Sequence, residues 1–168
     1  MEDAGRVRRG YFIAGLGAAQ FAALGAEDQL REFRDPPEVR EFETAVLAAT
    51  DPANPWGNAL SWPDTPQTGR PQRVAGARVF VTNGHLSAWL NRNNDQLTTF
   101  KSADSDNESW QRSLVGALAR LTKQRRSLLI TRVDGETPQQ SHLSRVLLAA
   151  GFVSTTKGFL HRGNVHDA

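Results

Sequence analysis

Residues 77–90, ARVFVTNGHLSAWL, carry the clearest structural signal in the sequence. Two runs rich in β-branched and aromatic residues flank the pair Asn83-Gly84, which is a preferred pair for a type I′ turn. A second turn at 92–95 leads into a third run at 96–100. The pattern predicts three antiparallel strands joined as a meander.

Helical patterns follow this meander. From Trp110 to Leu121 apolar residues recur at steps of four, three, one and three, which places them on one face of a helix that opens at 104–107. Further elements are predicted in chain order: a strand at 127–133, a turn at Asp134-Gly135, a short helix at 141–150, and a closing hairpin of 152–154 and 159–162. The sum is an α+β fold, a mostly antiparallel, barrel-like sheet with two or three helices.

The N-terminal part has a different pattern. A strand is predicted at 6–13 and a short helix at 25–34, which ends before Pro36-Pro37. Residues 2–5 are typical of a helix end, and we expect the rest of that helix to lie upstream. Residues 51–71 hold five of the eight prolines and two of the four tryptophans, so they form an ordered loop or a linker.

Composition excludes several classes of chemistry. The chain has no cysteine, which rules out disulfides, thiolate metal sites and thiol nucleophiles. No apolar run approaches the roughly 18 residues of a membrane helix, and the N-terminus lacks the apolar segment of a secretory signal, so a cytoplasmic protein without a membrane partner is expected. The net charge is only +2, but seventeen of the twenty basic residues are arginine, which favours bidentate contacts to phosphate.

One motif is a near miss to a dinucleotide-binding loop. Gly15-Leu16-Gly17-Ala18-Ala19-Gln20 has Gln20 in place of the third glycine, and the preceding strand carries arginines where a buried parallel strand is apolar. We interpret it as a glycine-rich turn between a strand and a helix, although Glu38 lies at the expected distance. No P-loop motif is present, so no cofactor is expected for this chain.

The histidines predict no metal centre. His85, His142, His161 and His166 are isolated in the sequence, without the spacing that metal sites use. No serine lies in the G-x-S-x-G pattern of a nucleophile elbow.

Basic residues alternate with flat side chains in a pattern typical of nucleic-acid binding. Arginine holds phosphates and aromatic rings stack on bases, which together bind single strands without sequence preference. The alternative is that the tryptophans pack against the sheet and the arginines are simply solvated. The candidate residues are Arg6, Arg8, Arg9 and Tyr11 on the first strand, Trp56 and Trp62 in the proline-rich loop, and Arg70 and Arg73 after it.

A catalytic candidate lies in the C-terminal tail, where His166 and Asp167 are adjacent. A carboxylate is the group that a base-excising enzyme uses to orient water or to stabilise an oxocarbenium-like sugar. Asp167 is the candidate for that role, and Asp51 is a weaker one.

Four segments resemble, in this order, the C-terminal region of the large helicase-related (Lhr) family of ATP-dependent DNA helicases, and they span about Arg6 to Arg162. The resemblance implies that 1–14 are the end of a winged-helix domain, with the wing at 6–13, and that 15–168 form a β-barrel-like module. The segments are RVRRGYFIAGLGAAQFA, AEDQLREF, VLAATDPANPWGNALSWP and GARVFVTNGHLSAWLNR.

The resemblance also implies partners. These are DNA, single-stranded or as a tailed duplex, and upstream helicase and winged-helix domains of the same polypeptide, whose motor uses ATP and Mg²⁺. Our first hypothesis is a DNA-binding accessory module of a repair-associated helicase. The alternative is a base-excision module, because the C-terminal extension is similar to a winged-helix class of DNA glycosylases. Those enzymes have a Gln-x-Gln pair, and Ala18 stands where its first Gln would be. A third option is a protein-interaction platform.

Overall fold

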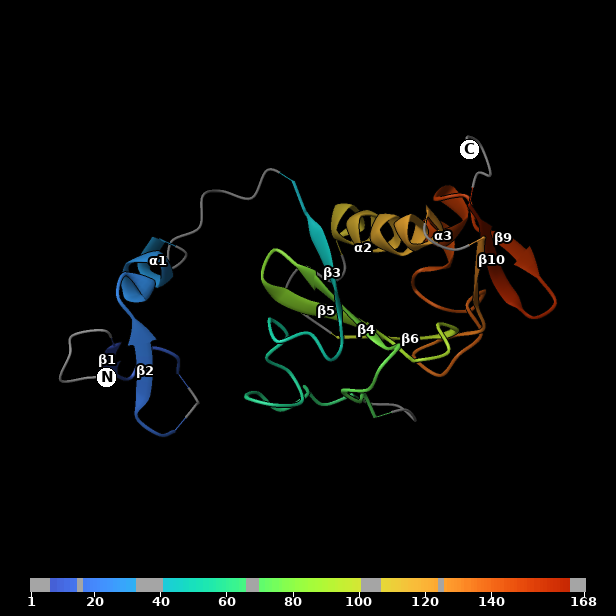
Figure 1. Ribbon diagram of the computed structural model, residues 1–168. Coiled ribbons are helices and arrows are strands. Elements are labelled where there is room, and N and C mark those ends of the chain that lie inside the picture. Colours follow the sequence, from blue (N-terminus) through green and yellow to red (C-terminus); the bar gives the residue numbers. More distant parts are fainter. Residues whose placement is uncertain are drawn as a thin grey trace. The chain divides into compact units, whose positions relative to one another are not determined.

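The computed structural model describes residues 7–14, 17–32, 41–65, 70–100, 107–123 and 126–163. The contacts divide the chain into two compact units, Met1–Arg40 and Glu41–Ala168, each of which is described by itself (Figure 1). Among the described residues, no helix has the length and the apolar character needed to cross a bilayer.

The first unit consists of a hairpin and a helix. Strands β1 (Val7–Gly10) and β2 (Gln20–Ala23) pair antiparallel, and α1 (Ala26–Glu32) follows. The predicted first strand and short helix are confirmed, but β2 was not expected. The glycine-rich segment leads from strand to strand, and not from strand to helix, because Gln20 pairs with Gly10 across the hairpin.

The predicted division into the end of a winged-helix domain at 1–14 and a β-barrel-like module at 15–168 stays a prediction. Within the described residues, the contact-based first unit holds both strands of the β1–β2 hairpin.

The second unit is built on a five-stranded sheet. Its strands are β3 (Thr44–Ala48), β4 (Arg78–Thr82), β5 (His85–Leu90), β6 (Gln96–Thr99) and β8 (Arg132–Val133), in the order β3-β4-β5-β6-β8. The meander is confirmed: Asn83 and Gly84 have φ of 46° and 83°, as a type I′ turn requires. Only β8 runs parallel to its neighbour, β6. Strand β3 was not predicted.

Two helices and a second sheet complete this unit. Helix α2 (Glu108–Arg120) is capped by the Asn107 side chain, which accepts a hydrogen bond from the Ser109 amide at 2.9 Å. A 3₁₀ turn (Leu121–Lys123) follows. The remaining elements are β7 (Ser127–Ile130), α3 (Ser144–Ala149), β9 (Val153–Thr155) and β10 (Gly158–Arg162), and their strands are ordered β7-β10-β9. Figure 1 shows α2 lying along the five-stranded sheet.

The α+β class and three α-helices are confirmed within the described residues, but the barrel is not found there. The strands of those residues form three separate sheets, and none closes on itself. The reason lies at Thr131, where the predicted strand 127–133 breaks. The amides of Thr131 and Arg132 both donate to the Asp95 carbonyl, at 2.7 and 3.3 Å, so the chain leaves one sheet and enters the other.

The five-stranded sheet is covered on both faces. Neighbours on a strand point to opposite faces. Phe80 therefore packs with Trp110 and Leu114 of α2, whereas Val79 packs with a second cluster that includes Trp56 and Trp62. The proline-rich segment 51–65 is thus an ordered loop that covers one face of the sheet.

Candidate nucleic-acid interface

The wing-like hairpin β1–β2 presents its arginines on two different faces. Residues directly opposite each other in an antiparallel pair share a face. Arg8 lies opposite the buried Ala22, and Arg9 lies opposite Phe21, which is 63% exposed. The two arginines therefore have different surroundings.

Arg8 is neutralised within the unit. Its Nη1 forms an ion pair with Oε1 of Glu27, the acidic residue in the first turn of α1. Glu27 is buried, and its second oxygen, Oε2, has no hydrogen-bond partner among the residues that the structure describes. A buried carboxylate is costly without a cation beside it, so Arg8 compensates Glu27.

Arg9 is different, because its exposed side chain has no hydrogen-bond or ion-pair partner among the described residues. Phe21 lies directly opposite Arg9 in the hairpin, and Tyr11, which is 79% exposed, follows one residue after the end of β1. The sequence analysis missed Phe21 because β2 was not recognised. A cation can bind a backbone phosphate, and exposed aromatic rings can stack on unpaired bases.

The Gln20 side chain binds the backbone of Phe12 and Ile13, just after β1. Its Oε1 accepts hydrogen bonds from the amides of Phe12 and Ile13, at 3.0 and 2.8 Å, and its Nε2 donates to the Ile13 carbonyl at 2.8 Å. This side chain therefore orders the loop at the end of β1. The near-miss dinucleotide motif belongs to this hairpin.

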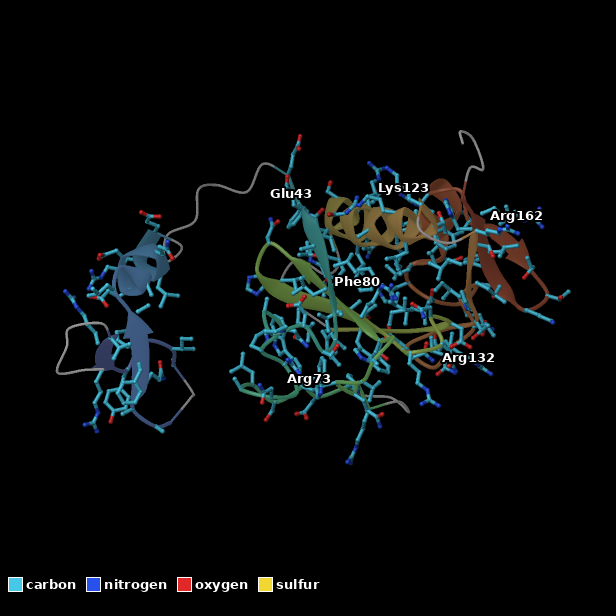
Figure 2. All side chains as sticks on the ribbon, in the orientation of Figure 1. Glu43, Arg73, Phe80, Lys123, Arg132 and Arg162 are labelled. Carbon is cyan, nitrogen blue, oxygen red and sulfur yellow. The ribbon has the colours of Figure 1, made fainter. Side chains whose placement is uncertain are left out.

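Of the other predicted arginines, Arg70 is exposed and Arg6 lies outside the described residues. Arg73 is a structural residue of the loop. Its guanidinium donates to the carbonyl of Asn54, to that of Asp51 at 3.0 Å and to that of Thr50 at 3.4 Å. Figure 2 labels Arg73 among the side chains of this loop. Its hydrogen bonds join residues 50–54 of the loop to the segment that leads into β4.

The two tryptophans are half-buried against the second cluster. The Trp62 ring stacks on Phe100 at a centroid distance of 6.5 Å and an interplanar angle of 12°. Gly57, at φ 75°, lets the indole come close, since a methyl group there would lie 2.5 Å from the indole nitrogen. Packing accounts for these rings, and base stacking on them stays a prediction.

The arginines of β1 and the tryptophan loop belong to different units, and a nucleic-acid contact by either of them stays a prediction. His166 and Asp167 lie outside the described residues. Asp51 accepts a hydrogen bond from the Ala53 amide at 2.8 Å and so shapes the loop.

Two of the described histidines, His142 and His161, have structural contacts, and His85 is exposed. The His161 ring lies 4.8 Å from that of Phe152, and its Nδ1 is 3.1 Å from the Thr122 hydroxyl. His142 Nδ1 lies 3.8 Å from a carboxylate oxygen of Asp134. Within the described part of the chain, no three His, Asp or Glu side chains come together in a group that could hold a metal ion.

Comparisons with known proteins point to one family. Residues 1–42 match the family model for the winged-helix domain of the large helicase-related protein. The chain is 42% identical over 168 residues to a Mycolicibacterium smegmatis protein named "Lhr helicase/ probable uracil glycosylase". The match covers 94% of this chain and 11% of that protein. It is 37% identical over 161 residues to the "Lhr helicase/uracil glycosylase" of Escherichia coli, and this match covers 94% of this chain and 10% of the Escherichia coli protein. The chain thus spans about a tenth of the length of these relatives.

Proposed function

Since the chain belongs to the large helicase-related family, we propose that it is a C-terminal, DNA-binding accessory module of an ATP-dependent helicase that takes part in DNA repair. Upstream helicase and winged-helix domains of the same polypeptide are its partners, and ATP and Mg²⁺ are bound by those motor domains. The protein acts in the cytoplasm on single-stranded DNA or on a tailed duplex.

The observation that supports this proposal is the pair formed by Arg9 and Phe21 across the hairpin, which lies within the winged-helix match. Arg9 contacts a backbone phosphate, and Phe21 and Tyr11 offer exposed rings to bases. Arg8 contributes less, because Glu27 already compensates its charge.

Arg8 and Arg9 provide a matched pair of variants. For single-stranded DNA, each phosphate contact contributes about 0.7 to the slope of log K, the association constant, against log salt concentration. If one contact contributes nothing at about 1 M salt, its loss lowers the association constant roughly fivefold at about 0.1 M salt. We expect this loss for Arg9→Ala, and a smaller loss for Arg8→Ala. Fluorescence anisotropy of labelled single-stranded and tailed oligonucleotides over a salt series measures both.

Two outcomes contradict the proposal. If Arg9→Ala and the double variant Phe21→Ala/Tyr11→Ala leave affinity and slope unchanged, the hairpin is not the interface. If the unaltered chain does not bind DNA at physiological salt, a protein-interaction platform is favoured.

A second candidate function is excision of a damaged or deaminated base, favoured by the words "uracil glycosylase" in the names of both relatives. Asp167 would orient the water or stabilise the sugar cation. The departure at Ala18 weakens this reading, and Gln20 is engaged by the backbone of Phe12 and Ile13. Incubation of the intact parent protein with uracil-containing and with alkylated DNA tests it. Equal excision by the parent and its Asp167→Asn variant excludes Asp167.

A further inference from the structure

A small polar pocket lies in the second unit, away from the elements considered so far. It has a volume of about 230 Å³ and is bounded by β8, the loop that follows it, and the turn between β9 and β10. The side chains that bear on its chemistry are those of Thr131, Arg132, Thr137, Gln139, Thr156 and Lys157. They are two cations, three hydroxyl groups and an amide. The Thr131 and Thr137 hydroxyls already donate to the Asp95 carbonyl and to Gln140 Oε1, and the Gln139 amide donates to Ser154 and Thr155. The side chains left to donate to a ligand are therefore those of Arg132, Thr156 and Lys157.

The turn that carries Lys157 is fixed in place. Gly158 has φ 140°, and a methyl group at its Cα would come within 2.1 Å of the Ile130 carbonyl oxygen, so only glycine allows this close approach. The Thr155 hydroxyl donates to the Gly158 carbonyl at 2.8 Å. Gln139 Nε2 donates to the Thr155 carbonyl at 3.3 Å and joins the loop to β9. The pocket walls are therefore held by backbone contacts.

The charge of the pocket is positive. The exposed ammonium of Lys157 has no hydrogen-bond or ion-pair partner among the described residues. Arg132 makes one long hydrogen bond, from Nη1 to the Gly135 carbonyl at 3.3 Å. Figure 2 labels Arg132 on the side of the unit where β9 and β10 lie.

Within the described part of the chain, no carboxylate lines the pocket. Asp134 lies two residues after Arg132 in the sequence but is not among the lining residues. Its carboxylate accepts hydrogen bonds from the amide and the hydroxyl of Thr99, at 2.6 and 2.7 Å. Glu136 is exposed but is not among the lining residues.

We propose that this pocket binds a backbone phosphate of a polynucleotide and gives the module a second contact with the strand. The Arg132 guanidinium and the Lys157 ammonium neutralise the phosphate charge, and the Thr156 hydroxyl can donate to one of its oxygens. A free phosphate would satisfy the same donors, but the exposed rim of Arg132, Thr156 and Lys157 leaves room for the chain on either side of a phosphodiester. The choice of a polynucleotide rests on the proposed function.

The test uses the full chain and amide NMR shifts, first with inorganic phosphate and then with a short single-stranded oligonucleotide. The amides of Arg132, Thr156 and Lys157 should shift with both. Lys157→Ala and Arg132→Ala should each weaken oligonucleotide binding roughly fivefold at about 0.1 M salt and lower the salt slope by about 0.7.

Two exposed cations of the same unit serve as charge-matched controls, because neither lines the pocket. Lys123→Ala matches Lys157→Ala, and Arg162→Ala, at the opposite end of β10 from Gly158, matches Arg132→Ala. Both controls should retain the affinity of the unaltered chain. A loss shared equally by the controls and the pocket variants overturns the proposal, because it shows a diffuse charge effect.

The remaining outcomes separate this pocket from the hairpin interface. If the oligonucleotide binds and depends on Arg9 while the pocket amides do not shift, the pocket proposal falls and the proposed function stands. If inorganic phosphate alone shifts those amides, the pocket takes a free phosphate and the polynucleotide is the wrong ligand. If neither shifts them, it is not an anion site.

Discussion

The two compact units use their apolar side chains in opposite ways. Among the described residues, five of the seven exposed large hydrophobic side chains lie in the first unit: Tyr11, Ile13, Phe21, Leu24 and Leu30. The second unit buries a continuous cluster around Trp110, Phe80 and Phe152. Burial of apolar area is the main source of folding free energy. The second unit is therefore stabilised by its own core, whereas the first leaves its large apolar side chains exposed.

The sharpest test of this contrast replaces one large aromatic residue in each unit. Trp110 is 2% exposed and Phe21 is 63% exposed. Trp110→Ala removes a buried ring and leaves a cavity, so we expect the free energy of unfolding of the second unit to fall by about 3–5 kcal/mol. Phe21→Ala should change stability by no more than about 0.5 kcal/mol. Chemical denaturation followed by circular dichroism measures both.

The contrast between the two units is contradicted if Trp110→Ala and Phe21→Ala lower the free energy of unfolding by similar amounts. In that case Phe21 would be a packing residue, and its proposed contact with bases would have no support. A Phe21→Ala chain of normal stability that binds DNA more weakly would strengthen the assignment.

A smaller effect is expected at the loop that covers the sheet. Trp62 is half-buried and stacks on Phe100, so Trp62→Ala should cost about 2 kcal/mol of unfolding free energy in the second unit. The matched variant Trp62→Phe keeps a ring and should lose less. Thermal unfolding with and without oligonucleotide distinguishes packing from base stacking: a variant of unchanged melting temperature but weakened DNA binding would show that the ring serves the ligand.

The sequence predicted the local elements of the second unit well, and the reason is periodicity. The Asn83-Gly84 turn and the stripe from Trp110 to Leu118 depend on neighbours in the chain, and both are confirmed. The barrel was wrong within the described residues, because the break at Thr131 depends on the distant Asp95 carbonyl. Strand β3 was missed, because its pairing partner β4 lies far along the chain, beyond the proline-rich loop.

The candidate site was predictable only in part. The sequence identifies Arg8 and Arg9 as equal candidates, and only the register of β1 with β2 and the ion pair with Glu27 separate them. Arg73 resembles a phosphate ligand in the sequence, yet its partners are carbonyl groups of the preceding loop. The ion pair of Arg8 and the hydrogen bonds of Arg73 join residues nineteen or more positions apart, beyond the reach of local patterns.

Arg73 gives the next prediction. Arg73→Met keeps most of the aliphatic stem but removes the donors to the carbonyls of Asn54, Asp51 and Thr50, so we expect a loss of about 1 kcal/mol in the second unit. Arg70→Met, at an exposed arginine nearby, is the control and should have no measurable effect on stability. Hydrogen exchange of the loop amides should accelerate only in the Arg73 variant. Unchanged exchange there would leave Arg73 available for DNA.

The smallest effect concerns the start of α2, where Arg145, through a hydrogen bond at 3.0 Å, and then Arg112, at 2.6 Å, lower the pKa of Glu108. Because the folded pKa lies below the unfolded one, the stabilisation is present above the ordinary pKa of glutamate and is lost as the pH falls through the folded value. The pair is solvent-exposed, so the effect should be slight and weaken with salt. Glu108→Gln should lower the melting temperature slightly at pH 7 and not at all at low pH, whereas Glu136→Gln, the exposed control, should do so at neither. A loss for Glu108→Gln that persists undiminished in acid would show that the carboxylate charge is not its cause.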